Sequence, residues 1–152
     1  MIHHCFGLVI ARNSEGKWLA VKETDDRGWW VPGGTMEKGE TFQQAAIRET
    51  KEEAGVDVEL KGVLRVEHTP CGKYYRMRVI FYAEPTEDSP PPKTQPDEES
   101  DEARWVSLDE LIELKQKPPG WRGKELYNWA KYVEDGGAIY PMSVLAFEDE
   151  EV

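Results

Sequence analysis

Three glutamates, Glu49, Glu52 and Glu53, stand close together in a segment, residues 41–54, that is predicted to be helical. At about 100° per residue, Glu49 and Glu53 continue the stripe begun by apolar Phe42, and Glu52 lies about 60° to one side of Glu49. All three carboxylates can therefore reach one point in space. Like charges in such a position repel each other, so the arrangement favours a bound cation.

Carboxylate oxygens with room for water suit Mg²⁺, and also Mn²⁺, better than Zn²⁺. The turn Pro32-Gly33-Gly34 precedes the helix, and its backbone can approach a ligand closely because no side chains intervene. A carbonyl there can add a further oxygen ligand. The alternative is an ordinary solvated helix rich in glutamate, in which Arg48 and Glu52 form an i,i+4 pair.

The helix that carries these glutamates has clear end signals. Thr41 is a plausible N-cap, and Gly55 is a typical C-terminal stop. The other expected elements are strands over 4–12 and 17–23 paired as a hairpin, a short extended piece over 29–31, strands over 56–69, 74–84 and 103–106, and helices over 107–115 and 121–134. Strands interleaved with helices predict an α/β layered fold around a mixed sheet.

A segment over residues 87–100 differs from the rest because it is rich in proline and acidic residues and has no apolar periodicity. We expect a mobile acidic loop there. A single domain is expected over residues 1–140, followed by a C-terminal segment, residues 141–152, that ends in an acidic tail.

The spacing of the polar and glycine residues resembles the Nudix box of the MutT-like hydrolases. Five residues separate Gly34 from Glu40, seven separate Glu40 from Arg48-Glu49, two precede Glu52-Glu53, and one precedes Gly55-Val56. One position departs from the box, because Thr50 stands where an aliphatic residue is expected. The order of elements follows the same family over roughly residues 4–135.

The resemblance implies an α/β/α sandwich with a central mixed β-sheet and a Mg²⁺-dependent hydrolase of diphosphate linkages. By similarity, the metal ligands are Glu49, Glu52, Glu53 and the Gly33 carbonyl, and Arg48 holds a box carboxylate in place. Glu40 is expected to be structural. The metal activates a water that attacks a phosphorus, with Glu49 as the preferred base.

A glutamate outside the box often joins the metal cluster in this family. Four acidic residues precede the strand over 103–106, and Glu102, which adjoins the strand, is the preferred candidate. The alternative is that all four are solvated loop residues. The four are Glu98, Glu99, Asp101 and Glu102.

Substrate contacts are expected from cations on strands and from an aromatic ring. Arg76 and Arg78 alternate along a strand and so share one face. The full candidate set is Lys22, Trp29, Arg65, Arg76 and Arg78. The alternatives are a solvent-facing sheet side for the cations and core packing for aromatic residues, and the adjacent Trp29 and Trp30 cannot both be buried if extended.

The substrate class is less determined than the chemistry. The segment Val79–Thr86 and the later Ala103-Arg104-Trp105 are similar to the branch of the family that degrades 8-oxo-guanine nucleoside diphosphates. Nucleoside di- or triphosphates are therefore preferred. The alternatives are ADP-ribose, to which Pro70 points, dinucleoside polyphosphates, to which Tyr74 points, and nucleotide sugars. A non-catalytic nucleotide-sensing domain is the rival class, although such domains usually lose box glutamates.

The composition limits the partners. Apolar residues make up 39% of the 152 residues, and no run is long enough to span a membrane, so a cytoplasmic location is expected. The formal net charge of −11 opposes binding to polymeric nucleic acid and to anionic lipids. Cys5 and Cys71 are expected to be reduced. A homodimer is compatible with the family resemblance.

Overall fold

The computed structural model describes residues 4–151. The strands are β1 (His4–Ala11), β2 (Trp18–Glu23), β3 (Gly28–Trp30), β4 (Gly33–Thr35), β5 (Val58–Cys71), β6 (Tyr74–Pro85) and β7 (Glu102–Val106). The helices are α1 (Phe42–Ala54), α2 (Leu108–Gln116), α3 (Glu125–Glu134) and the 3₁₀ turn η1 (Met142–Val144). Within residues 4–151, no helix is both long enough and apolar enough to cross a bilayer.

The strands form two sheets. The larger sheet has the order β4-β1-β6-β5 and is mixed, because β1 is parallel to β6 and antiparallel to β4. The smaller sheet, β3-β2-β7, is antiparallel. The expected hairpin of β1 and β2 is therefore wrong: the two strands lie in different sheets and meet only at an isolated bridge between Arg12 and Trp18. The buried run Leu8–Ala11 is instead typical of a central strand covered on both faces.

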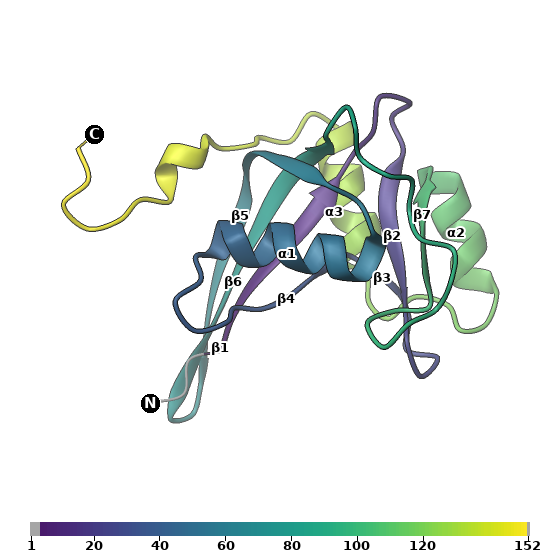
Figure 1. The fold of residues 1–152 in the computed structure, drawn as a ribbon, viewed down its shortest axis with the longest axis horizontal. Helices are drawn as coiled ribbons and strands as arrows, with labels where there is room; N and C mark the ends of the chain where they lie inside the picture. The colour runs from purple at the N-terminus through teal and green to yellow at the C-terminus, as the bar shows by residue number, and fades with distance from the viewer. Residues whose placement is uncertain (1–3, 152) are drawn as a thin grey trace.

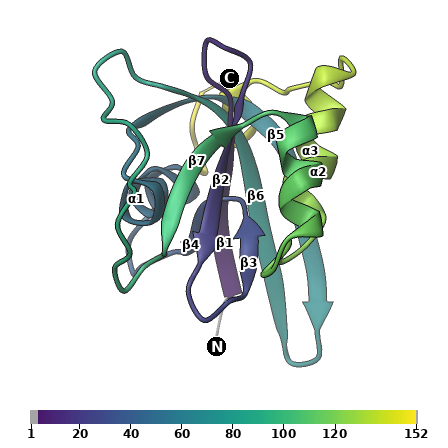
Figure 2. The ribbon, with the colours of Figure 1, turned by 90° about the vertical axis from the view of Figure 1, so that its right-hand side faces the viewer.

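The helices cover the strands from two sides, which confirms the α/β/α sandwich. Figure 2 shows α1 on one side of the strands and α2 and α3 on the other. Figure 1 shows the β5–β6 hairpin extending beyond the rest of the large sheet. Alternate residues of β1 supply the two cores: Val9 packs toward α1, and Leu8 and Ile10 pack toward the α3 side.

Helix α1 begins and ends where the sequence predicts. The Thr41 hydroxyl accepts the Gln44 N–H, and the Gln44 side chain accepts the Thr41 N–H, which completes a capping box. Gly55 has the left-handed conformation of a C-terminal stop, with φ of 73°. Thr50, the departure from the box, is fully buried and its hydroxyl donates to the Ala46 carbonyl.

Two expectations about aromatic residues and helix bounds are wrong. Trp29 and Trp30 are 3% and 8% exposed, so both are buried although they face opposite sides of β3. The segment after α2 explains this, because the Gly120 carbonyl accepts the Trp29 N–H and Arg122 stacks over the Trp30 ring at 4.4 Å. Because residues 120–122 pair with β3, α3 begins at Glu125 and not at the predicted residue 121.

The segment after α3 returns to the large sheet. Val63 and Tyr140 exchange two backbone hydrogen bonds of 2.8 Å, at the outer side of β5. Met142 and Leu145 then pack against the core beneath α1. Cys5 and Cys71 are both free, as expected.

Candidate functional site

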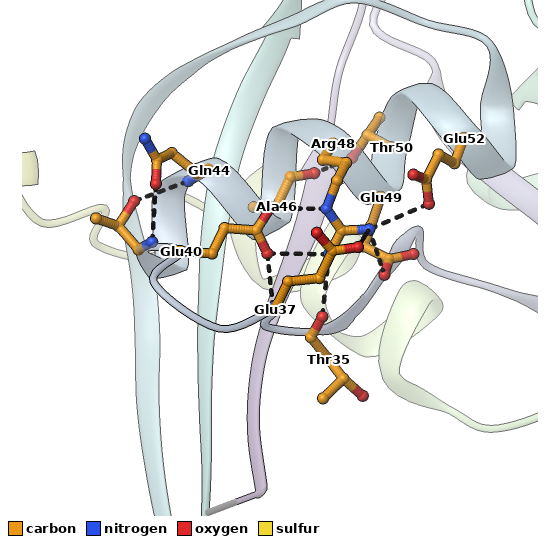
Figure 3. Close-up of polar contacts among 10 residues, drawn as sticks. Thr35, Glu37, Glu40, Gln44, Ala46, Arg48, Glu49, Thr50 and Glu52 are labelled. Carbon is orange, nitrogen blue, oxygen red and sulfur yellow. Dashed lines mark hydrogen bonds and ion pairs between the residues drawn. The ribbon is translucent and has the colours of Figure 1, made fainter.

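Arg48 lies at the centre of the polar residues on α1 (Figure 3). Its guanidinium donates to both oxygens of Glu40, at 2.7 and 3.0 Å, and one of its nitrogens, Nη1, lies 3.1 Å from both Glu49 and Glu52. It also donates to the Thr35 carbonyl on β4. The hydrogen bond from Arg48 holds the pKa of Glu40 below its usual value. Arg48 thus joins the loop before the helix, the helix itself and β4.

Glu53 is partly buried, and its carboxylate is directed toward β4. Its Oε1 accepts the backbone N–H of Gly33 at 2.7 Å. Burial raises the pKa of its carboxyl to about 8, although the Gly33 hydrogen bond opposes the shift, and the neighbouring charges of Glu49, Glu23 and Glu99 add to it. Glu53 therefore lies in a site that has excess negative charge.

Glu49 lies against Gly34, the residue of β4 that follows Gly33. A Cβ placed on Gly34 would be 2.6 Å from the Glu49 carboxyl carbon, so only glycine leaves room for this side chain. Burial raises the pKa of Glu49, while Arg48 lowers it. Glu49 and Glu53 thus contact adjacent glycines of β4, the strand that carries the predicted carbonyl ligand.

The three carboxylates do not yet surround one point. Among residues 4–151, no three side chains of the His, Cys, Asp or Glu type are arranged as a ready set of metal ligands. Glu49 and Glu52 bind Arg48, whereas Glu53 binds the Gly33 N–H, so a shared metal position for the three carboxylates stays a prediction.

The donor set nevertheless fits a hard divalent cation. The candidate ligands, which are the three box carboxylates and the Gly33 carbonyl, all bind through oxygen, which is the ligand type of Mg²⁺ and Mn²⁺. The raised pKa values of Glu49 and Glu53 mark a place where added positive charge is stabilising. The glycines of β4 leave the backbone open to a ligand beside both side chains.

The acidic segment over residues 87–100 is attached to this helix, contrary to the expected mobile loop. Lys93 and Ser100 donate hydrogen bonds to carbonyls at the end of α1, and Ser100 is fully buried. The charge of Glu99, which lies in this segment, contributes to the raised pKa of both Glu49 and Glu53. The Glu102 carboxylate accepts hydrogen bonds from Nε and Nη2 of Arg104.

Glu23 was not singled out from the sequence, yet it influences Glu53. It is 5% exposed and accepts two hydrogen bonds from Arg122, at 2.8 and 2.7 Å. Its charge contributes to the raised pKa of Glu53. No local pattern could have identified it, because its partner is 99 residues away and it ends a strand in an ordinary polar position.

The predicted substrate-binding residues are not gathered at the carboxylates. Trp29 is buried, and Arg104 covers its ring at 4.9 Å, so its ring is not available for stacking. Arg65 and Arg78 both pair with Glu67. Arg76 lies over Phe6 at 4.8 Å. Of the five candidates, Lys22 alone lies on the strand, β2, that also carries Glu23.

Comparison with known proteins adds to this geometry. A family model described as NUDIX domain matches residues 1–130. Putative nudix hydrolase 1 of Caenorhabditis elegans is 36% identical over 115 residues, which are 72% of this chain and 30% of that protein. Human 8-oxo-dGDP phosphatase NUDT18 is 40% identical over 101 residues, which are 64% of this chain and 30% of that protein. The chain thus spans about a third of the length of these curated relatives.

Among solved structures, a hydrolase from Nitrosomonas europaea resembles this chain over its whole length. The match has a TM-score of 0.76 and covers 99% of this chain and 100% of that one, at 21% sequence identity. At this identity the likeness concerns the fold. It supports the two-sheet architecture that places α1 beside β4.

Proposed function

The chain belongs to the Nudix family, and from this premise we propose that it hydrolyses the diphosphate linkage of a nucleoside diphosphate-type compound with the help of a divalent metal ion. The observation that carries the proposal is the position of Glu49 and Glu53 against adjacent glycines of β4, with Glu52 beside them on Arg48. Mg²⁺ is the preferred metal because the ligands are all oxygens.

In this proposal Glu49, Glu52 and Glu53 hold the metal together with the Gly33 carbonyl, and Glu99 replaces Glu102 as the acidic residue from outside the helix. A bound metal supplies a more acidic water and neutralises charge on the phosphate oxygens. Glu49 takes the proton of the attacking water. Burial raises the pKa of its carboxyl, which makes the carboxylate a stronger base.

Arg48 has two proposed tasks. Its bidentate bond to Glu40 fixes the guanidinium, and the remaining nitrogen then orients Glu49 and Glu52. A guanidinium held in this way keeps two like charges close to each other before a cation arrives. Arg48 is therefore proposed to prepare the site rather than to contact the substrate.

The preferred substrate is an 8-oxo-guanine nucleoside diphosphate. The support is the 40% identity, over 101 residues, to a human protein named as an 8-oxo-dGDP phosphatase. The predicted cation set does not reach the carboxylates, since Arg65 and Arg78 are paired with Glu67. Substrate preference is therefore proposed from the relative and not from these cations.

A nucleotide panel with Mg²⁺ tests the proposal. Release of phosphate or of nucleoside monophosphate is measured for 8-oxo-dGDP, dGDP, dGTP, ADP-ribose, a nucleotide sugar and a dinucleoside polyphosphate. We expect the oxidised diphosphate to give the highest kcat/KM. Glu52→Gln and Glu53→Gln should abolish turnover while the circular dichroism spectrum is retained. Glu113→Gln, on the exposed side of α2, is the matched control and should be fully active. Turnover at the wild-type rate in both box variants would exclude the site.

A further inference from the structure

The last turn of α1 is held by three hydrogen bonds from one loop. The Glu52 carbonyl accepts the ammonium of Lys93 at 3.2 Å, the Glu53 carbonyl accepts the hydroxyl of Ser100 at 2.6 Å, and the Ala54 carbonyl accepts the backbone N–H of Lys93 at 2.9 Å. The last carbonyls of a helix have no partner within the helix itself. Here they are satisfied by residues about 40 positions further along the chain.

Asp97 organises the loop that supplies these donors. One of its oxygens, Oδ1, accepts the Lys93 ammonium at 2.6 Å and the backbone N–H groups of Glu99 and Ser100 at 2.8 and 3.1 Å. We call Lys93, Asp97 and Ser100 the loop clip. Glu99 lies between Asp97 and Ser100 in the sequence. The clip therefore fixes the position of the Glu99 backbone relative to α1.

The clip acts on the two residues whose side chains are proposed as metal ligands. Lys93 binds the backbone of Glu52, and Ser100 binds the backbone of Glu53. Figure 1 shows the segment between β6 and β7 passing the C-terminal end of α1, where these contacts lie. A small rotation of this last turn would move both carboxylates and would change their distance from Glu99.

Helix termination alone does not require the clip. The Gly55 N–H already closes the turn on the Lys51 carbonyl, and Lys51 provides a cation near the same end, where it pairs with Asp57 at 3.2 Å. The side chain of Lys93 differs from that of Lys51 because it is largely buried, with 15% exposure against 48%. Ser100 is fully buried as well. Both buried side chains bind the backbone carbonyls of residues that carry box carboxylates, Glu52 and Glu53.

We propose that the loop clip consists of positioning residues that set the geometry of Glu52, Glu53 and Glu99 for binding a divalent cation. This inference rests on the proposed function for its metal site, and it assigns a role to a segment whose composition predicts only a mobile loop. The clip does not touch the substrate. It acts through the backbone of α1, which bears the ligands Glu52 and Glu53, and through the backbone of Glu99.

Mn²⁺ binding to the metal-free protein tests the proposal independently of turnover. The electron paramagnetic resonance signal of free Mn²⁺ gives the dissociation constant for the wild type, Lys93→Met and Lys51→Met. We expect about a 10- to 100-fold weaker affinity in Lys93→Met, as for residues that orient metal ligands. Lys51→Met removes the same charge from the same end of α1 and should stay within about threefold of the wild type, since it leaves the clip intact.

Two further variants keep the test decisive if Lys93→Met is poorly folded. Asp97→Asn, at an exposed position, should weaken Mn²⁺ binding in the same direction, and Ser100→Ala should do so through the backbone of Glu53 alone. In each variant the kcat for the diphosphate should fall while KM changes less, and Lys93→Arg should recover part of the affinity because it keeps a cationic donor.

Equal Mn²⁺ affinity in the wild type, Lys93→Met and Asp97→Asn would overturn the inference, and so would an equal loss in Lys51→Met. The proposed function fails in a different way: the wild type would bind Mn²⁺ and cleave none of the nucleotides in the panel. The two failures are therefore distinguishable, because metal affinity is compared between variants and turnover is measured on the wild type.

Discussion

Replacement of Gly34 by alanine should inactivate the protein without unfolding it. A methyl group there would lie 2.6 Å from the Glu49 carboxyl carbon and 2.7 and 2.9 Å from its oxygens. Ordinary contact begins at 3.4 Å, so the carboxylate must move by about 0.8 Å. A misplacement of about 1 Å at a reacting group lowers turnover by about 100-fold. We expect a loss of kcat of this order.

The stability of Gly34→Ala should change little. The Glu49 side chain is 16% exposed, so it can shift toward solvent, and the backbone of Gly34 does not have a positive φ that alanine would strain. Urea unfolding should give a free energy of unfolding within about 1 kcal/mol of the wild type. A kcat within threefold of the wild type, in a protein that remains folded, would refute the role given to the position of Glu49.

Gly7→Ala is the matched control, because Gly7 is the residue of β1 that pairs with Gly34. A methyl group there would meet the backbone of α1, 2.6 Å from the Phe42 carbonyl oxygen and 2.9 Å from the Ala46 nitrogen. Backbone cannot rotate away as a side chain can. This variant should lose about 1–3 kcal/mol of unfolding free energy, the usual cost of overpacking. The same substitution at two paired positions thus separates activity from stability.

Two other predictions concern buried carboxylates. The pKa of Glu53 is raised from 4.5 to about 8, so between these values the folded protein binds more protons than the unfolded chain, and unfolding free energy in EDTA should fall with rising pH by up to about 1.4 kcal/mol per unit. Glu53→Gln should remove this slope, and an unchanged slope would contradict the assignment. Arg122→Leu should cost about 1–3 kcal/mol at pH 7, because the buried Glu23 carboxylate loses the Arg122 Nη1 donor that contacts both of its oxygens. The Glu23→Gln background should reduce that cost, as thermal denaturation would show.

Local signals in the sequence predicted the elements that carry the site. Thr41 and Gly55 fixed the ends of α1, and Ser107 with Glu110 gave the capping box of α2. These features depend on hydrogen bonds between residues a few positions apart, which is why sequence spacing identifies them. The position of Arg48 beside the carboxylates follows from the same short-range geometry.

Long-range pairings account for the errors. Two consecutive strand-like segments joined by a turn suggested a hairpin of β1 and β2, but β1 takes β6 and β4 as neighbours because both of its faces are apolar. Trp29 is buried by the loop after α2, which lies about 90 residues later in the chain. The segment over residues 87–100 is held against the end of α1 by Lys93 and Ser100, which bind carbonyls about 40 positions earlier in the chain. These long-range contacts cannot be predicted from the spacing of residues along the sequence.

The paired bonds between Val63 and Tyr140 cover part of the outer border of β5, which is the last strand of its sheet within residues 4–151. The family model ends at residue 130, so a shortened protein cut to that model would retain every box residue and yet uncover this border. Unsatisfied amides and carbonyls along an open strand recruit another chain by sheet extension. A protein trimmed in this way would also lose the last turn of α3, which ends at Glu134, and it would tend to self-associate although the helix that bears the box glutamates is intact.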